Sequence, residues 1–203
     1  MRTTLSRLIS NAAIQDEKMF VLSGDHGYAL FDEVRKTRPD QFINAGVSEQ
    51  AMIGYASGMM KVGLRTIIYG LSAFVPIRVL EQIKLDLCLS KRPAILLGDG
   101  AGVVYTTLGS SHQCAEDIAC LRALPYLKIF SPCDQYELET CFEEALASDV
   151  PVYIRIGKSD RPAVHTIKPA FTGMHTISQM NSKIGLVATG SMVSIAAEIG
   201  KKF

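Results

Sequence analysis

Glu49 is the side chain in this sequence whose type and setting are best suited to chemistry. It follows Gly46 and Ser48, after a short apolar run at residues 42–45 and at the start of a helical pattern at residues 48–62. A carboxyl group placed between a strand and a helix can exchange a proton with a bound ligand. It can equally do no more than complement the positive end of a helix whose N-cap is Ser48. These residues alone leave both readings open.

Two other polar side chains lie in glycine-containing stretches that read as loops. His112 precedes Gln113, and an imidazole can polarise or reprotonate an oxygen near neutral pH. Asp25 lies between Gly24 and His26, where an aspartate either serves a binding site or caps its own loop. For His112 the competing reading is an ordinary surface histidine.

The elements that position these residues alternate between short apolar runs and longer segments with helical spacing. This alternation predicts an α/β fold: a mostly parallel sheet with helices on both faces. Strands are expected at residues 19–22, 42–45, 66–69, 94–97, 127–130, 152–156 and 184–188. Helices are expected at residues 48–62, 74–89 and 134–147, the last with Asp134 as its N-cap. Gly or Pro follows most of the runs, so the functional loops should lie at the carboxyl edge of the sheet.

The domain organisation that we expect is one large domain, a linker and an incomplete second unit. Residues 1–156 form the domain, and residues 157–182, with Pro162 and Pro169, form a polar linker. Residues 183–203 read as one strand and one helix, which cannot bury a core of their own. The chain is therefore either a fragment of a longer protein or packs this last unit on another surface.

Composition excludes several classes of partner. The formal charge is +1, so no electrostatic footprint for nucleic acid or for a membrane surface is present. No apolar run approaches the roughly 20 residues needed to cross a bilayer, and the first residues lack the apolar core of a signal peptide. The expected location is cytoplasmic. The five cysteines form no Cys-x-x-Cys pair and suggest reduced thiols rather than disulfides or a thiolate metal site.

Three stretches resemble the pyrimidine-binding domain of transketolases, and most of all the split form in which this domain is a separate subunit. Residues 42–58 are similar to the family's strand, glycine, glutamate and small-residue helix. Residues 73–83 resemble the aromatic-led helix that walls the cofactor's pyrimidine ring, and residues 109–125 resemble the His-Gln active-site loop. Residues 187–191 resemble the start of the third transketolase domain, so the resemblance spans nearly the whole chain.

This resemblance implies thiamine diphosphate as the cofactor and assigns residues to it. Glu49 matches the catalytic carboxyl that activates the cofactor through its pyrimidine ring, and Phe74 matches the aromatic side chain that packs on that ring. Ile77 and Leu80 fall where transketolases often carry further aromatic residues, and aliphatic walls could still hold the ring. Asp25 resembles an acidic residue near the subunit interface.

The resemblance also assigns substrate contacts and shows where this sequence departs from them. His112 matches the histidine that transfers a proton to substrate, and Lys158 lies where the family has a basic phosphate-binding residue; a solvated linker lysine is the alternative. Transketolases place a histidine and an aspartate where this chain has Gly98 and Leu108. These departures put the ordinary ketose phosphate donor in doubt.

The diphosphate end of the cofactor has no evident site in this sequence. Gly98-Asp99-Gly100 resembles the start of the family's magnesium and diphosphate motif, but the asparagine that should follow about 25 to 30 residues later is missing. The asparagines of the chain are Asn11, Asn44 and Asn181. We therefore expect no metal ligands here and a separate diphosphate-binding subunit that holds Mg²⁺ or Ca²⁺. Two copies of each subunit would form a heterotetramer, with self-association through the pyrimidine domain.

The function that the resemblance implies is two-carbon ketol transfer between sugars, expected to be phosphorylated, with the chain inactive alone. A deoxyxylulose phosphate synthase-like or 2-oxo-acid dehydrogenase beta-like thiamine enzyme is an alternative, because both use the same glutamate. A non-catalytic partner subunit is another. A generic nucleotide-binding domain is disfavoured, because the sequence has neither Gly-x-Gly-x-x-Gly nor a P-loop.

Overall fold

The fold is known from a computed structural model that describes residues 1–157, 162–179 and 183–202. Its centre is a six-stranded sheet of order β2-β1-β3-β4-β6-β5, and every pairing is parallel. The strands are β1 (Met19–Ser23), β2 (Phe42–Asn44), β3 (Arg65–Leu71), β4 (Ile95–Asp99), β5 (Lys128–Phe130) and β6 (Val152–Ile156). The predicted α/β fold with a parallel sheet is confirmed, and the first six expected strands lie within one or two residues of those observed.

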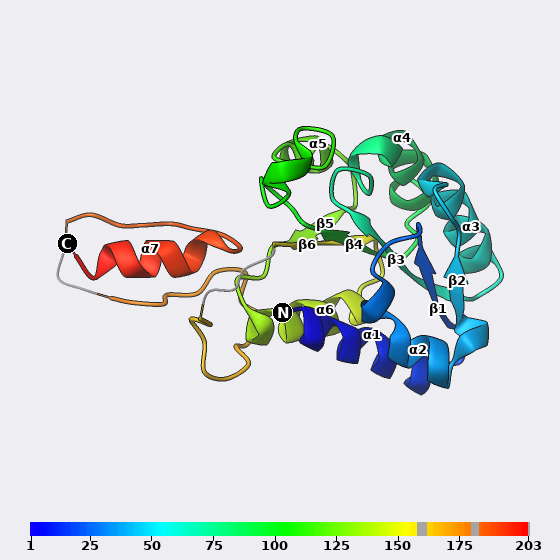
Figure 1. The fold of residues 1–203 in the computed structure, drawn as a ribbon, viewed down its shortest axis with the longest axis horizontal. Coiled ribbons are helices and arrows are strands. Elements are labelled where there is room, and N and C mark those ends of the chain that lie inside the picture. The colour runs from blue at the N-terminus through cyan, green and yellow to red at the C-terminus, as the bar shows by residue number, and fades with distance from the viewer. Residues whose placement is uncertain (158–161, 180–182, 203) are drawn as a thin grey trace.

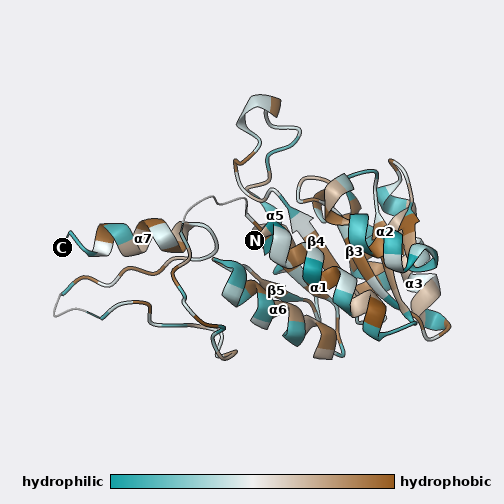
Figure 2. Cartoon of the chain, turned by 60° about the horizontal axis from the view of Figure 1, so that its bottom comes forward, coloured by the Kyte–Doolittle hydropathy of each residue, from teal (hydrophilic) through white to brown (hydrophobic). Residues whose placement is uncertain are grey.

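Helices cover both faces of the sheet, as Figure 1 shows. One face carries α1 (Arg2–Gln15), α2 (Asp32–Thr37) and α6 (Gln135–Ala147). The other carries α3 (Glu49–Lys61), α4 (Leu80–Gln82), the π-helix Ile83–Cys88 and α5 (Asp117–Leu121). Short 3-10 turns occur at Tyr28–Leu30, Pro39–Gln41, Ile77–Val79 and Thr106–Leu108. Apolar side chains of the strands pack under the helices on both faces of the sheet. Figure 2 shows the hydropathy of the residues in these layers.

Residues 74–89 do not form the continuous helix that the apolar spacing predicted. Residues 72–76 are turn, and the helical part begins only at Ile77, passing from 3-10 through α to π geometry. Pro76 explains the late start, because proline lacks a backbone N–H and disfavours helical geometry in Val75 before it. The consequence for the site is that Phe74 lies in a turn rather than on the face of a helix.

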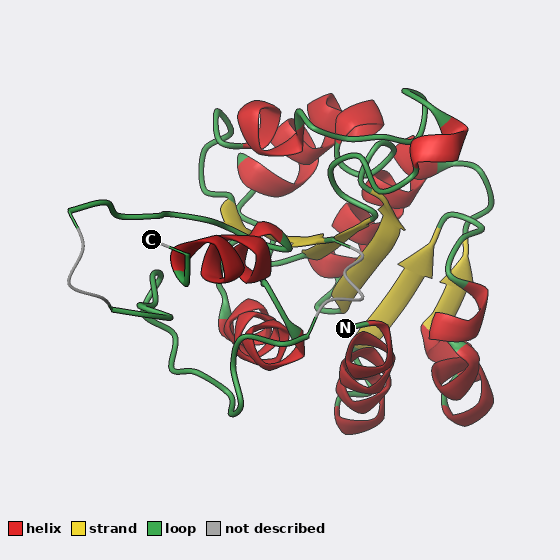
Figure 3. Ribbon diagram, turned by 60° about the vertical axis from the view of Figure 1, so that its left-hand side comes forward, coloured by secondary structure: helices red, strands yellow, loops and turns green. Residues whose placement is uncertain are grey.

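Residues 184–188 were predicted to be a strand, and that prediction is wrong. Residues 184–189 belong to no strand of the described chain, and Val187 is 92% exposed. A strand needs a hydrogen-bonding neighbour, and the described part of this unit supplies only α7 (Met192–Gly200), which contains no buried residue. Figure 3 shows α7 and the loops around it beside the sheet rather than inside it. The domain and linker boundaries at residues 156 and 182 stay predictions.

The two expected N-caps differ in the structure. Ser48 is the N-cap residue of α3, as predicted, but its hydroxyl makes no capping hydrogen bond. Asp134 caps α6, because its Oδ1 accepts hydrogen bonds from the backbone N–H groups of Tyr136 (3.1 Å) and Glu137 (3.0 Å).

None of the described helices combines the length and the apolar composition that a bilayer crossing requires.

Replacing Asp134 with alanine is expected to lower the free energy of unfolding by about 1–2 kcal/mol, while asparagine keeps most of the cap. Burial by itself would raise the pKa of Asp134, but hydrogen bonds from Glu137 and His165 outweigh burial and hold the pKa below its usual value. A lowered carboxyl pKa means that the stabilisation is present above about pH 4 and is lost as the pH falls further. Urea unfolding at pH 7 and pH 3.5 measures this; an equal effect of D134A at both pH values would contradict it.

Candidate functional site

The candidate site lies at the carboxyl edge of the sheet, where the loops that follow four neighbouring strands meet. Asp25 follows β1, Glu49 begins α3 after β2, Phe74 follows β3, and His112 lies in the long loop after β4. Parallel strands end at the same edge, so the topology alone brings these four segments together. The first two of these segments are close together, because a Cβ added at Gly24 would lie 3.7 Å from Glu49 Cγ.

Glu49 is buried, with 3% of its side chain exposed, and its two carboxyl oxygens differ in their surroundings. Oε2 accepts a hydrogen bond from Arg78 Nη1 at 3.0 Å. Oε1 is also buried but has no hydrogen-bond partner among the described residues. A cavity of about 450 Å³ adjoins this carboxyl and is lined by residues 47–51 and Arg78. A buried oxygen without a partner is costly, so this atom favours a ligand that forms a hydrogen bond with it.

Arg78 links Glu49 to Phe74, and no motif in the sequence had pointed to it. Its guanidinium carbon lies 4.1 Å from the centre of the Phe74 ring, a cation–π contact. The side chain is 45% exposed, so the pair with Glu49 is open to solvent on one side. The sequence could have pointed to Arg78 only because it is a single basic residue within the apolar run after Phe74.

His112 joins the same group of side chains through ring contacts. Its ring centre lies 5.3 Å from that of Phe74 and 6.4 Å from that of Tyr105. Its Nδ1 is 2.9 Å from Ser111 Oγ, and its backbone N–H donates to the Gly109 carbonyl at 3.1 Å. Glu49, Arg78, Phe74 and His112 therefore form a continuous series of contacts along the edge of the sheet.

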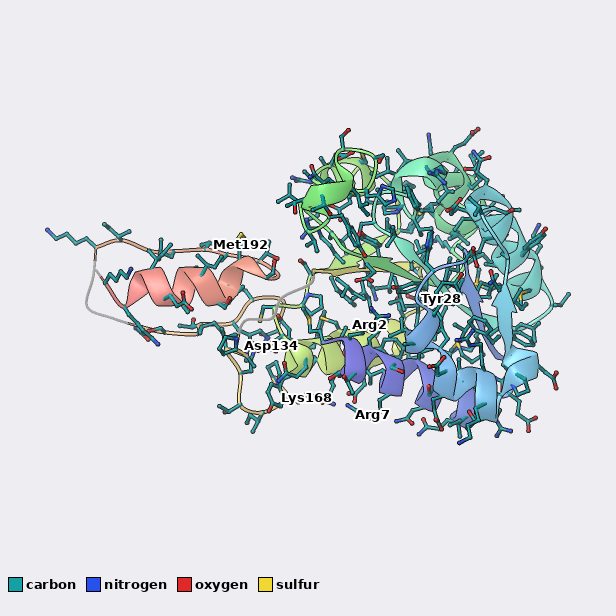
Figure 4. All side chains as sticks on the ribbon, viewed as in Figure 1. Arg2, Arg7, Tyr28, Asp134, Lys168 and Met192 are labelled. Atoms are coloured by element: carbon teal, nitrogen blue, oxygen red, sulfur yellow. The ribbon has the colours of Figure 1, made fainter. Side chains whose placement is uncertain are left out.

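Asp25 lies next to this series and is held by its own loop. It adopts a left-handed backbone with φ 61°, and its Oδ1 accepts hydrogen bonds from Tyr28 (3.1 Å) and Asn44 Nδ2 (3.2 Å). The hydrogen bond to Asp25 raises the pKa of Tyr28, which Figure 4 labels near the end of β1. The adjacent His26 places its ring 5.6 Å from that of Phe74.

The other predicted site residues are less closely associated with the cavity. Leu80 packs against the core under α3, and Ile77 is half-buried in its 3-10 turn. Among the described residues, Glu49 is the one predicted site residue in the cavity lining, which includes neither Ile77 and Leu80 nor Phe74, His112 and Asp25. The loss of helical geometry before Ile77 removes the shared face on which the sequence spacing had placed these residues with Phe74. Lys158 lies outside the described residues.

The glycine at position 98 has a structural cause. A Cβ at Gly98 would lie 2.3 Å from the Tyr153 hydroxyl, so Tyr153 fills the space that a larger residue would need. Tyr153 donates to Asp117 at 2.9 Å, and Arg155 Nε donates to the same carboxylate at 2.9 Å. Burial, followed by the charge of Asp117, raises the pKa of Tyr153. This buried polar cluster was missed from the sequence, because its members are far apart along the chain.

Comparison with known proteins identifies the family. Residues 1–162 match the family model described as the transketolase pyrimidine-binding domain. A subunit of the apulose-4-phosphate transketolase of Phocaeicola vulgatus is 31% identical over 165 residues, which are 81% of this chain and 53% of that protein. The 1-deoxy-D-xylulose-5-phosphate synthase of Symbiobacterium thermophilum is 30% identical over 80% of this chain and 25% of its own length.

A solved structure described as a split gene transketolase, an inactive beta4 tetramer, has a fold similar to that of this chain. It matches 84% of this chain and 55% of its own with a TM-score of 0.73 and 29% identity. The chain thus spans about half the length of the Phocaeicola vulgatus protein and of this structure. The parallel sheet, the gathered strand-end loops and the matched domain together show that the chain belongs to the transketolase family, of which it carries the pyrimidine-binding domain.

Proposed function

We propose that this chain is the pyrimidine-binding subunit of a two-chain, thiamine diphosphate-dependent enzyme that transfers two-carbon ketol units between sugars. The observation that carries the proposal is Glu49 Oε1, a buried carboxyl oxygen without a partner among the described residues, beside a cavity. An aminopyrimidine fits this atom, because its ring nitrogen can share a proton with the carboxyl. When bound, thiamine diphosphate supplies carbanion stabilisation at the donor carbonyl carbon.

Glu49 would bind the pyrimidine ring and hold a proton at Oε1, while Arg78 holds Oε2. The two oxygens would have different roles because their surroundings differ. Oε2 accepts a hydrogen bond from Arg78, whereas Oε1 has no partner among the described residues. The burial of the carboxyl, with 3% of the side chain exposed, strengthens its hydrogen bond to the ring. Asp25 would support the neighbouring loop at the subunit interface, and Ile77 and Leu80 would act as aliphatic walls around the ring.

Phe74 would stack on the pyrimidine ring, and F74A tests this. We expect F74A to raise the KM for thiamine diphosphate about tenfold with a smaller change in kcat, because ring stacking is worth about 0.5–1.5 kcal/mol beyond the apolar area buried. Steady-state kinetics of the assembled enzyme measure it. F171A is the matched control, because Phe171 is paired with Phe130 instead. An unchanged KM in F74A would contradict the stacking role.

His112 would give and take a proton at a substrate oxygen, and Lys158 would contact a substrate phosphate. The contact between His112 and Phe74 supports the first assignment, because it places the imidazole beside the proposed ring site. The assignment of Lys158 rests on its place in the sequence. Because Gly98 and Leu108 replace two family contacts to the donor, we propose a donor other than the ordinary ketose phosphates.

A second subunit would supply the diphosphate site and Mg²⁺ or Ca²⁺. The sequence lacks the asparagine of that motif, and the similar protein from Phocaeicola vulgatus is itself described as one subunit of a transketolase. Two copies of each subunit would form a heterotetramer around a twofold axis, with the pyrimidine domains in contact with each other. We propose that this complex works in the cytoplasm, in keeping with five free cysteines.

Donor chemistry separates the proposed function from its nearest alternative. A ketose donor is cleaved between two carbons without loss of CO₂, whereas a 2-oxo acid donor, as used by deoxyxylulose phosphate synthase-like enzymes, releases it. The assembled enzyme should therefore be screened with ketoses and with pyruvate, while aldehyde product and CO₂ are measured. Aldehyde release from a ketose supports the proposal, and turnover only of 2-oxo acids would replace it with the synthase-like alternative.

A further inference from the structure

Cys133, Asp134 and His165 bring three metal-binding side chains together, away from the candidate site. Cys133 and Asp134 precede α6, whereas His165 lies in the segment after β6. One potential ligand atom from each of the three lies within 4.8 Å of the other two. Figure 4 labels Asp134 at this end of α6, on the side of the molecule from which the C-terminal unit extends. The cysteine spacing gave no sign of a site, because the third side chain is about thirty residues away in the sequence.

The distances suit a tetrahedral transition metal. His165 Nδ1 lies 3.7 Å from Cys133 Sγ and 3.0 Å from Asp134 Oδ2. Zinc bonds of about 2.0–2.1 Å to nitrogen or oxygen and about 2.3 Å to sulfur, at tetrahedral angles, require separations of about 3.6 Å and about 3.3 Å. The two distances from His165 Nδ1 are within a few tenths of an ångström of these values, and the thiol and carboxylate lie within 4.8 Å of each other. A side-chain shift of at most about 1.2 Å would therefore bring the three atoms around one ion.

Asp134 is oriented for this role by the backbone. Its Oδ1 accepts two hydrogen bonds from the first turn of α6, and Oδ2 accepts from the backbone N–H groups of Val164 (3.1 Å) and His165 (2.9 Å). Backbone donors fix the carboxylate as outer partners fix the ligands of a metal site. A bound ion would replace only the hydrogen bond from the His165 ring and leave these four in place.

His165 Nδ1 faces both Cys133 Sγ and Asp134 Oδ2, but it can form a hydrogen bond with only one of them. If Nδ1 carries a hydrogen and donates it to Asp134, no lone pair is left there for the Cys133 thiol. The Cys133 thiol then has no acceptor at Nδ1 for its own hydrogen. A single divalent ion between the three atoms would satisfy all of them by displacing both protons.

The charges around the cluster are compatible with a cation. The N-terminal end of α6 disfavours a cation, since the helix dipole is positive there. Asp134 and a Cys133 thiolate together neutralise a divalent ion, and Glu137 adds a further carboxylate whose Oε2 accepts the Cys133 backbone N–H at 2.7 Å. His175, whose ring centre is 5.8 Å from that of His165, lies outside the group of three, so water would fill a fourth position.

We propose that Cys133, Asp134 and His165 form a zinc-binding site that fastens the segment after β6 to the start of α6. Sulfur, imidazole and carboxylate donors together match the ligand preferences of Zn²⁺ rather than those of Mg²⁺ or Ca²⁺. The site is independent of the proposed cofactor chemistry. Its consequence is structural, because it ties the polar segment that leads to α7 onto the sheet domain.

The test uses the complete protein, purified without a polyhistidine tag and without chelator. We expect about one zinc per chain by elemental analysis. After removal of zinc, titration with Co²⁺ should give tetrahedral d–d absorption and a sulfur-to-cobalt charge-transfer band. Less than about a tenth of an equivalent of zinc, together with a featureless Co²⁺ titration, would overturn the proposal.

Variants assign the ligands. C133S should remove the charge-transfer band, and H165Q should weaken Co²⁺ binding at least tenfold, as expected for loss of a ligand. C120S is the control, since Cys120 lies outside the cluster. D134N separates binding from folding, because asparagine still caps α6 while the carboxylate is lost. We expect D134N to stay folded without metal, with a lower thermal stability because its amide nitrogen cannot accept from the Val164 and His165 N–H groups, and to bind Co²⁺ at least tenfold more weakly. Unchanged binding in D134N or an unchanged spectrum in C133S would overturn the assignment.

Discussion

Replacing Glu49 with glutamine is expected to lower kcat of the assembled enzyme about 10²–10⁴-fold, the range that a positioned acid or base contributes. Glutamine has nearly the same shape as glutamate, and its carbonyl oxygen can still accept the hydrogen bond from Arg78 that Oε2 accepts now. What glutamine lacks is a proton that it can share with a ring nitrogen. Assembly should therefore be unaffected while turnover is lost.

The comparison for E49Q is the same change at an exposed position. Glu81 lies in α4 and is exposed, so E81Q should alter kcat less than twofold. Subunit assembly, measured by size-exclusion chromatography with light scattering, checks that both variants form the same complex. Full activity in E49Q would show that the carboxyl is not catalytic and would favour a non-catalytic subunit with a retained fold.

Replacing Asp117 with alanine is expected to lower the free energy of unfolding by about 3–5 kcal/mol, as when one member of a buried ion pair is removed. Asp117 is completely buried and accepts hydrogen bonds from both Arg155 and Tyr153. Arg155 has 16% of its side chain exposed, so without Asp117 its charge would stay largely buried and lack this carboxylate. Tyr153, which donates to Asp117, also fills the space beside Gly98.

Urea unfolding measures this effect, with two variants for calibration. D16A removes a partner of Arg65 in a pair that is 30–39% exposed, so the expected loss is about 1 kcal/mol or less. Y153F removes only the Tyr153 hydroxyl and should cost about 1 kcal/mol. A D117A effect no larger than that of D16A would contradict the importance of the buried cluster.

The sheet was predictable because each strand is marked locally by a short apolar run followed by Gly or Pro. β1, β3, β4 and β6 are buried on both faces, so apolar residues follow one another along them rather than alternating with polar ones. Residues 184–188 carry the same local pattern but form no strand, since the described chain supplies no neighbour for hydrogen bonding. An apolar run predicts only that a strand is possible, and pairing decides whether one forms.

The candidate site was predictable where its residues lie in short local patterns and was missed where contacts cross the chain. Glu49 and His112 could be named from the residues beside them. Arg78 was missed, because its role depends on a contact with Glu49, which is 29 residues away. The tight fit between Tyr153 and Gly98 was likewise invisible in the sequence, although it accounts for the glycine at that position.

The most direct test of a site shared between two chains is the activity of this chain, expressed from its complete reading frame, with and without a diphosphate-binding partner. We expect no ketol transfer by either protein alone, weak binding of thiamine diphosphate by this chain in calorimetry, and turnover when the two are mixed. E49Q in the mixture should remain assembled and inactive. Robust ketol transfer by this chain alone would contradict the shared site, because Glu49 would then be part of a complete site rather than half of one.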